Sequence, residues 1–382
     1  MTWTNVYFVC FFAALIISLI MTPACRQVAF FFNILDQPAV QNHKRHSKAI
    51  PLLGGMALCF SWLTTIAIGI LISRTYLMAG HLDKSVISEI HGTSNVSKEL
   101  ISLCLGAVLI TLFGLYDDVC NMKAKTKFAG QFVVAVIAAT WGGAKVSIFL
   151  ANPILSWAIS VFWILVIMNA INFFDNMDGL AIGTGTIAFV FFAIIAAING
   201  QHFVAVFGAT MAGAAFGFWF YNCSPATIFM GDSGSHLLGY NLAILGCLVT
   251  YYNPSLSYTK IPILIPLFIL AIPLYDLCAV VIIRWRNSKP FYIGDHNHLS
   301  HRFVKMGLSR PNAVKAVHLM VLAIGLSSLP LIWGDLKTTV ICVIQATTIL
   351  MLVSLLQNYV ISAQNTDMLN DQIKTDDKTK NG

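Results

Sequence analysis

The residues of this sequence best suited to chemistry are aspartates, because the chain has few acids and groups them. Only 16 of its 382 residues are Asp or Glu. Two of them, Asp117 and Asp118, are adjacent at the end of an apolar run, and Lys123, Lys125 and Lys127 follow. Neighbouring carboxylates repel each other and need a cation. The pair is either part of a reactive site or a solvated helix end that the lysines neutralise.

A second polar group lies shortly after another apolar run. If this segment is helical, Asn172, Asp175 and Asp178 recur every three residues and share one face. Such a row is unfavourable against lipid and is better placed in a cavity between helix ends. There the amide can donate to a ligand, and the carboxylates can accept from a ribose or orient a metal-bound water. The alternative is a polar turn between two helices.

A third group is the segment Phe-Met-Gly-Asp-Ser-Gly-Ser that ends at Ser235. Gly231 and Gly234 let the backbone approach a ligand, and small hydroxyls before a helix suit a phosphate. Asp232 offers a hard oxygen to Mg²⁺, which takes one or two carboxylates and keeps waters or substrate phosphates as its other ligands. The alternative is a turn in which the Asp or a Ser caps the next helix.

The fourth group is rich in histidine. His296, His298 and His301 lie close together, and Arg302 follows. Imidazole and guanidinium donors suit a diphosphate. Zinc is a rival ligand, but Asp295 is the only further ligand at a suitable spacing and the guanidinium disfavours a dication. A solvated basic loop is the third interpretation.

A basic stretch from His43 to Lys48 precedes a segment marked by Pro51, Gly54 and Gly55. Lys48 is well placed to meet a lipid phosphate at the start of the next helix. Taken alone, the simpler interpretation of the stretch is a positively charged anchor at the membrane surface.

The composition places all these groups in a membrane protein. Hydrophobic residues make up 57% of the chain and charged residues 10%, whereas soluble domains are about 45–50% apolar and about 25% charged. A water-soluble globule is therefore excluded. The predicted fold class is all-α, a polytopic helical bundle with 10 to 11 transmembrane helices. The eleven expected spans lie near residues 4–24, 49–73, 100–116, 127–143, 154–172, 180–199, 203–221, 236–252, 261–283, 314–333 and 338–360.

The basic residues predict the orientation of this bundle, with the N-terminus outside. In that orientation only six of the 23 Lys and Arg residues face outward, namely Arg74, Lys84, Lys98, Lys145, Lys260 and Lys337. Eight of the 16 acids then fall at or just beyond cytoplasmic helix ends, namely Asp36, Asp117, Asp118, Asp175, Asp178, Asp232, Asp276 and Asp295. The basic residues are dispersed over several loops, which argues against nucleic-acid binding. Residues 1–361 are expected to form the membrane domain, and residues 362–382 a disordered polar cytoplasmic tail.

Together and in this order, the segments from Asp36 to Pro311 resemble the polyprenyl-phosphate N-acetylhexosamine-1-phosphate transferase family. The resemblance implies transfer of a sugar-1-phosphate from a UDP-sugar to undecaprenyl phosphate, with release of UMP. It implies UDP-N-acetylglucosamine as the favoured donor, Mg²⁺ or Mn²⁺ as cofactor, and the start of a cell-surface glycan such as an O-antigen. The implied location is the bacterial cytoplasmic (inner) membrane, with the active site on the cytoplasmic face; a homodimer is left open.

The resemblance also implies roles for the residues singled out above. Asp117 would deprotonate or orient the lipid phosphate, Asp232 would bind the metal, and Asp118 would lie near it. A two-step mechanism with an aspartate nucleophile is an open alternative. The residues expected to bind the nucleotide, the diphosphate or the lipid phosphate are Lys48, Asn172, Asp175, Asp178, His298, His301 and Arg302.

The sequence departs from the family pattern at two positions. Where the family loop usually reads His-(Ile/Leu)-His-His, this chain has Ser300 in place of the middle histidine, and Asn176 stands where the family commonly has glycine. Three rival functions are a phospho-N-acetylmuramoyl-pentapeptide transferase, an inactive scaffold for glycan assembly and a polytopic transporter. A transporter is expected to place its ionisable groups near mid-membrane, which does not match the acids here.

Overall fold

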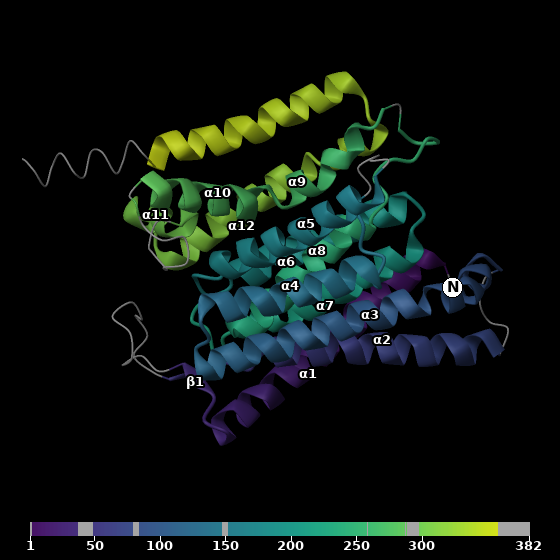
Figure 1. Cartoon of the computed structure of the whole chain (residues 1–382), viewed down its shortest axis with the longest axis horizontal. Helices are drawn as coiled ribbons and strands as arrows, with labels where there is room; N and C mark the ends of the chain where they lie inside the picture. Colours follow the sequence, from purple (N-terminus) through teal and green to yellow (C-terminus); the bar gives the residue numbers. More distant parts are fainter. Residues whose placement is uncertain are drawn as a thin grey trace, which may run out of the picture.

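The protein is almost entirely helical, in agreement with the predicted class (Figure 1). The computed structural model describes residues 2–36, 49–78, 84–146, 152–257, 259–286, 288 and 298–357. Within these ranges the strands are β1 (Leu35–Asp36) and β2 (Ile50–Pro51), which pair antiparallel. Lys48, Asp295, His296 and the tail predicted at 362–382 lie outside the described residues.

Each of the eleven predicted spans contains a helix. The helices from the first half of the chain are α1 (Trp3–Phe31), α2 (Gly54–Met78), α3 (Lys84–Cys120), α4 (Ala124–Thr140), α5 (Pro153–Phe174) and α6 (Leu180–Ile198). Those that follow are α7 (His202–Asn222), α8 (Gly231–Leu248), η2 (Ile261–Leu264), α9 (Ile265–Ile269), α10 (Ala271–Arg286), α11 (Leu299–Lys305), α12 (Arg310–Leu326), η3 (Pro330–Trp333) and a last helix, Leu336–Gln357. The long helices run side by side across the molecule (Figure 1).

Eight helices of the described part are long and apolar enough to cross a membrane. A ninth span is obtained if η2, α9 and α10 count as one, although their axes bend by 71°. Pro273 lies in the first turn of α10. Because proline has no N–H and its ring clashes with the carbonyl four residues earlier, it explains why the helix breaks near Leu270. The expected spans at α4 and α8 are helical but do not belong to the eight.

Helix α8 forms the centre of the bundle. It packs against α2, α3, α5, α6 and α7, and every residue from Ser233 to Cys247 is buried. Since protein rather than lipid surrounds α8, it can carry the polar residues His236 and Asn241 in its interior. This environment explains how α8 can lie inside the bundle although it is not one of the eight apolar spans.

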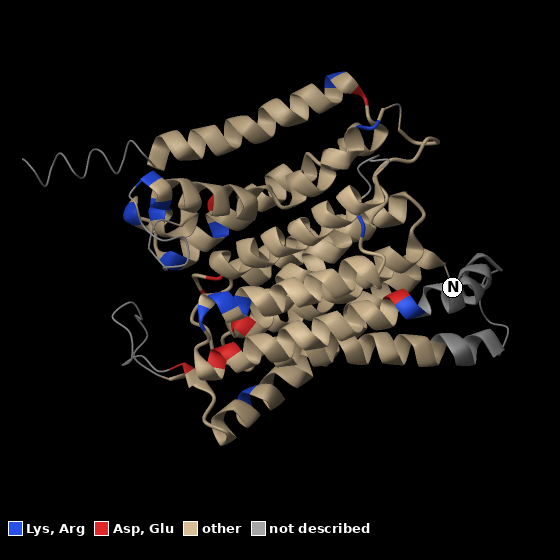
Figure 2. Cartoon of the chain, viewed as in Figure 1, with Lys and Arg blue, Asp and Glu red and all other residues tan. Residues whose placement is uncertain are grey.

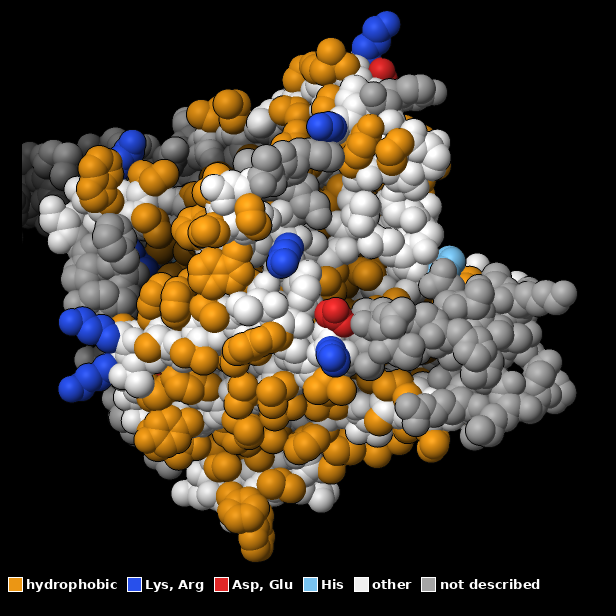
Figure 3. Space-filling view, turned by 45° about the vertical axis from the view of Figure 1, so that its right-hand side comes forward, with side chains coloured by type: hydrophobic (Ala, Val, Ile, Leu, Met, Phe, Trp, Pro, Cys, Tyr) orange, Lys and Arg blue, Asp and Glu red, His pale blue; other side chains and the backbone are white. Residues whose placement is uncertain are grey.

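The outer surface and the helix ends differ in character. Hydrophobic side chains cover much of the surface, with few charged groups among them (Figure 3), and Phe8, Phe12 and Ile20 of α1 are exposed. Most of the charged residues that the structure describes gather at one end of the bundle (Figure 2). This distribution is that of a protein whose sides face lipid and whose polar chemistry lies at one membrane surface.

Candidate functional site

The last turn of α3 and the start of α8 are joined through Asp118. Its carboxylate oxygens accept hydrogen bonds from the backbone N–H groups of Asp232 (2.7 Å) and Ser233 (3.1 Å). A carboxylate is favourable at this place because it satisfies free N–H groups and faces the positive end of the helix. Gly231 has φ +68°, and a Cβ there would lie 2.5 Å from the carboxylate of Asp118. Glycine is therefore required for this close approach.

Two of the sequence motifs meet through their main chains. The N–H groups of Gly54 and Gly55, at the start of α2, donate to the carbonyls of Phe229 (3.1 Å) and Met230 (3.0 Å). A Cβ on Gly55 would lie only 2.2 Å from the backbone nitrogen of Gly234. The glycines thus let α2 lie against the segment that leads into α8, and they fix the position of that segment.

Lys127 of α4 connects two of the acids. Its ammonium lies 3.0 Å from Oδ2 of Asp117 and 2.7 Å from Oδ2 of Asp232. Asp117 also accepts the backbone N–H of Met122 (2.7 Å). The Asp117 side chain is buried, whereas that of Asp232 is 31% exposed. A ligand can therefore reach Asp232 directly.

The two other lysines that follow Asp117 and Asp118 in the sequence do not take part in this bridge. Lys123 and Lys125 are exposed. Within the part of the chain that the structure describes, Lys127 is the one of the three that neutralises the pair. The interpretation as a helix end neutralised by lysines is thus correct for Lys127, but the ion pair extends to Asp232, more than a hundred residues away.

Asn172 lies at the same place, as predicted. Its amide donates to Oδ1 of Asp232 (2.6 Å) and to Oγ of Ser235 (2.8 Å). A separate chain of hydrogen bonds lies nearby: Asn169 donates to Gln131 (2.8 Å), and Gln131 is bonded to Nε2 of His236 (2.7 Å). Both oxygens of Asp232 are therefore held by fixed donors.

The condition for a helical row of Asn172, Asp175 and Asp178 is met only by Asn172, which lies in the last turn of α5. Helix α5 ends at Phe174, and the chain turns before Gly179, whose φ is +75°. The alternative of a polar turn is therefore correct. The three side chains nevertheless remain at one site, because the turn lies next to the start of α8.

Asp175 and Asp178 extend the acidic group. Asp178 accepts the backbone N–H of Ala226 (3.1 Å). Burial, and to a smaller extent the charges of Asp232, Asp118 and Asp178, together raise the pKa of Asp175 to about 8. Near neutral pH this carboxyl therefore holds a proton unless a cation compensates the group.

The histidine segment is joined to this site by side-chain contacts. Ser300 donates to Oδ1 of Asn176 (2.6 Å), in the turn after α5. The two positions that depart from the family pattern are thus in direct contact. The ring of His298 lies 6.4 Å from that of His301. Arg302 is buried, and its Nε and Nη2 atoms have no partner among the described residues. An unpaired buried guanidinium favours an anionic ligand.

The acidic group has the ligand chemistry that Mg²⁺ prefers. Five aspartates, partly neutralised by Lys127, offer hard oxygens in one place, namely Asp117, Asp118, Asp175, Asp178 and Asp232. In the described ranges no three His, Cys, Asp or Glu side chains are grouped so that they hold a metal by themselves. Mg²⁺ is commonly bound by only one or two carboxylates together with substrate phosphates.

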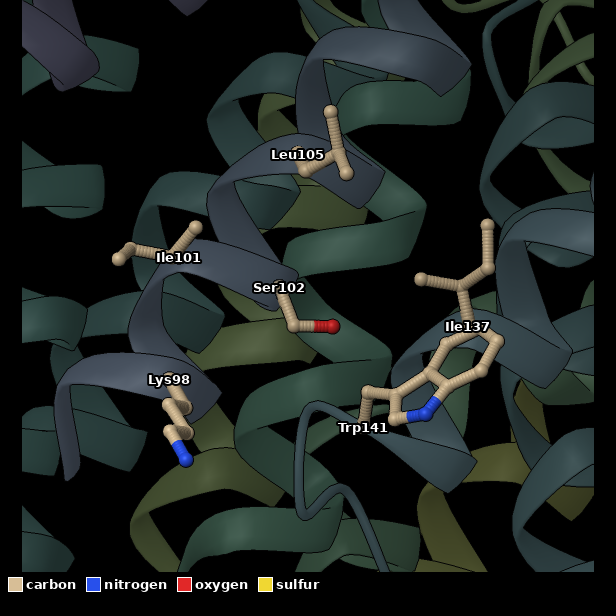
Figure 4. Close-up of a pocket in the computed structure, with 6 residues that line it drawn as sticks. All are labelled: Lys98, Ile101, Ser102, Leu105, Ile137 and Trp141. Atoms are coloured by element: carbon tan, nitrogen blue, oxygen red, sulfur yellow. The ribbon is translucent and has the colours of Figure 1, made fainter. Parts of the chain in front are cut away.

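A hydrophobic groove lies elsewhere on the bundle, between α3 and α4 (Figure 4). Its lining is mostly apolar and contains none of the aspartates described above. The residues are Lys98, Ile101, Ser102, Leu105, Ile137 and Trp141. Because Ile101, Leu105 and Trp141 are exposed on the outside of the bundle, the groove suits a lipid chain better than a polar ligand.

Sequence reasoning did not assign several residues that hold this site together. Lys127 was considered only as a neutralising charge, and Gln131, His236 and Asp276 received no role. An ionisable residue within an apolar run is a functional candidate in its own right. That signal was present for Asp276 and His236.

Comparisons with known proteins show the family of the chain. The sequence model of the family described as Glycosyl transferase family 4 matches residues 100–250. The chain is 32% identical over 349 residues to a "Probable undecaprenyl-phosphate N-acetylglucosaminyl 1-phosphate transferase" of Bacillus subtilis, a match that covers 88% of this chain and 89% of that protein.

Two further relatives cover less of the chain. A "Decaprenyl-phosphate N-acetylglucosaminephosphotransferase" of Mycobacterium tuberculosis is 32% identical over 57% of this chain and 60% of its own length. A "Phospho-N-acetylmuramoyl-pentapeptide-transferase" of Bacillus pumilus is 31% identical over 60% of this chain and 69% of its own length. The fold and these matches define a multi-pass membrane enzyme. The chain belongs to glycosyl transferase family 4, which confirms the resemblance seen in the sequence.

Proposed function

We propose that this enzyme transfers N-acetylglucosamine-1-phosphate from its UDP-sugar to undecaprenyl phosphate, releases UMP, and thereby starts a lipid-linked cell-surface glycan. The name of the Bacillus subtilis relative supports this choice of sugar and acceptor. The observation that carries the proposal is that α11, with the unpaired buried guanidinium of Arg302, is joined through Ser300 and Asn176 to the turn that borders the acidic group. A UDP-sugar diphosphate needs both a metal and basic donors.

The chemical difficulty of the reaction is the repulsion between two anions. An oxygen of the lipid phosphate attacks the phosphorus that bears the sugar, and UMP leaves. Mg²⁺, or Mn²⁺ in its place, held by Asp232 with Asp118 nearby, would neutralise the diphosphate and stabilise the charge that develops there.

The chain's own groups then position the reactants. Asp117, beside the ammonium of Lys127, orients or deprotonates the lipid phosphate. Lys127 offers its charge to an incoming phosphate in exchange for one of its two aspartates. Both the one-step mechanism and the route through an aspartate nucleophile start from this arrangement.

The second half of the site would hold the donor. We assign His298, His301 and Arg302 to the diphosphate, because Arg302 keeps two unpaired nitrogens. We assign Asn172, Asp175 and Asp178 to the nucleotide side, and Lys48 to a lipid phosphate. In this assignment the donor lies between the turn after α5 and the start of α11.

We further propose that this end of the bundle faces the cytoplasm of a bacterial inner membrane. The excess of Lys and Arg in the segments at this end supports that orientation. Reporter fusions after Gly231 and after Leu299 should both give cytoplasmic signals. A periplasmic signal from either fusion contradicts the proposed orientation.

A donor screen tests the function. Purified protein in lipid with undecaprenyl phosphate should form a lipid-linked sugar from UDP-N-acetylglucosamine. The relative in Bacillus pumilus makes phospho-N-acetylmuramoyl-pentapeptide transfer the second candidate, and product from that UDP-linked donor alone would establish it instead. No lipid-linked product from any UDP-N-acetylhexosamine contradicts both candidates.

A further inference from the structure

Asp276 is a buried acid that lies apart from the acidic group. It belongs to α10, and only 1% of its surface is exposed. A buried carboxylate is costly unless polar partners satisfy it. Its position in an apolar helix of a membrane protein therefore calls for a specific role.

Both carboxylate oxygens of Asp276 contact the beginning of α11. Oδ2 lies 2.7 Å from Nδ1 of His298, and Oδ1 accepts the backbone N–H of Leu299 at 2.6 Å. His298 is the N-cap residue of α11, but its own side chain makes no capping hydrogen bond. Asp276 therefore supplies the cap from another helix and holds the imidazole ring with the same group.

The contact at Nδ1 determines what the rest of the ring can do. Because Nδ1 is bound to a carboxylate, Nε2 is the nitrogen left for a ligand. A protonated ring between the carboxylate and a phosphate oxygen donates one hydrogen bond to each. Arg302 follows one helical turn later, since its N–H donates to the carbonyl of His298 (3.0 Å). The start of α11 thus sets the position of both the His298 ring and the Arg302 guanidinium.

Asp276 is not the sole attachment of α11. Ser300 donates to Asn176 (2.6 Å), and the amide of Gln357 donates to the carbonyl of Leu299 (3.4 Å). The helix therefore keeps two other contacts when Asp276 changes. The contribution that no other described contact supplies is the orientation of the His298 ring.

We propose that Asp276 is a positioning residue that holds Nδ1 of His298 as a hydrogen-bond donor, so that Nε2 binds an anionic phosphate of the donor substrate. The proposal rests on the proposed function for the identity of that phosphate. It assigns to Asp276 a role in donor binding that it exerts through His298, and no direct contact with the substrate.

The first test is kinetic and uses Asp276→Asn. The amide keeps the shape and an acceptor for Leu299 but loses the charge. We expect the KM for the UDP-sugar to rise about 10-fold or more, and the KM for the polyprenyl phosphate to change less than about twofold. Tyr275→Phe is the matched control, because it removes a hydrogen bond to Ser354 from the neighbouring position of α10. This control should leave both KM values unchanged.

A double substitution separates positioning from a structural role. If Asp276 acts through His298, then Asp276→Asn should add less than about twofold to the loss caused by His298→Ala. Multiplied losses, or a wild-type KM in Asp276→Asn, overturn the proposal. Both results require that the wild type turns over a UDP-sugar.

A spectroscopic test does not depend on turnover. In protein labelled with ¹⁵N-histidine, the His298 signals are identified by their loss in His298→Ala. We expect Nδ1 to carry a hydrogen in the wild type, and this pattern to change in Asp276→Asn. A wild-type Nδ1 without hydrogen overturns the proposal even if the enzyme is active. An inactive wild type with the expected Nδ1–H would contradict the proposed function and leave the positioning role supported.

Discussion

The two sides of the site are held in different ways. The acidic side consists of the ends of long helices packed around α8. It is fixed by main-chain hydrogen bonds from Gly54 and Gly55 and by the carboxylate of Asp118, which accepts the N–H groups of Asp232 and Ser233. The basic side is the short helix α11, whose attachments to α10 and to the turn after α5 are the side-chain contacts of Asp276 and Asn176. The first side is therefore held by several packed long helices, whereas the second is one short helix that packs through Leu299 and Phe303 and whose polar end is held by a few hydrogen bonds.

Because the two sides are held differently, we expect substitutions on each side to change a different step of the reaction. Changes on the acidic side should act on the chemical step, because in the proposed mechanism its aspartates hold the metal and its Lys127 meets the incoming phosphate. Changes on the basic side should act on donor binding, because they move α11. The predictions below, taken from the largest expected effect to the smallest, test whether this division is correct.

Removal of divalent metal should have the largest effect. EDTA should reduce the formation of lipid-linked sugar to background, because the acidic side then has no dication to pair with the diphosphate. Addition of Mg²⁺ in excess should restore activity. Unchanged turnover in EDTA would show that no dissociable metal is needed.

Substitution of the central acids should be nearly as severe. Asp232→Ala and Asp117→Asn should each lower turnover by about 100- to 1,000-fold, since they remove the two partners of Lys127. Product formation is measured on purified protein, and insertion is checked by the amount recovered from membranes. Full activity in both variants is incompatible with the proposed mechanism.

Lys127 should matter more than its neighbours. Lys127→Met leaves Asp117 and Asp232 without their ammonium and should lower turnover by about 10- to 100-fold. Lys125→Met is the matched control, because Lys125 is exposed on the same helix; it should stay within about twofold of the wild type. Equal losses in the two variants would mean that the bridge has no specific role.

The contact between Asn176 and Ser300 should affect donor binding moderately. Asn176→Ala and Ser300→Ala should each raise the KM for the UDP-sugar by about fivefold, the amount expected from one buried hydrogen bond. The KM of the double variant should be no higher than the higher of the two single-variant values, because both substitutions remove the same contact. Independent, multiplied effects would show that the two residues act separately.

The smallest effect concerns stability. In metal-free protein the pKa of Asp175 is raised to about 8 from its ordinary 3.8. Between these pH values the folded protein retains a proton that the unfolded chain has released, so stability falls as the pH rises. Asp175→Asn removes this penalty. Its gain in Tm should therefore be larger at about pH 8 than at about pH 5, and a gain that does not depend on pH contradicts the assigned cause.

Much of the fold could be predicted from the sequence because apolar runs of span length correspond directly to helices. The breaks were harder to predict. The bend before α10 depends on Pro273 inside an apolar run, and the end of α5 at Phe174 depends on a turn that also suited a continued helix. Helix α8 starts at Gly231, earlier than predicted, because Asp118 caps it from a distant helix.

The candidate site could be predicted only in part, because contacts between distant segments leave no pattern in the sequence. Asp117, Asp118, Asn172 and Asp232 form recognisable local patterns, and the structure brings them together. The pairs Asp276–His298 and Asn176–Ser300 join residues that are distant in the sequence, and no local pattern indicates that these residues pair. Lys48 stays a prediction, because it lies outside the described residues.

The most direct test of the account is the identity of the nucleotide released. Purified enzyme is incubated with undecaprenyl phosphate and UDP-N-acetylglucosamine whose β-phosphorus is labelled, and the lipid and nucleotide products are separated. The account predicts label in the lipid and release of one UMP for each lipid-linked sugar formed. Release of UDP with an unlabelled lipid product would contradict it, because the enzyme would then transfer the sugar without its phosphate.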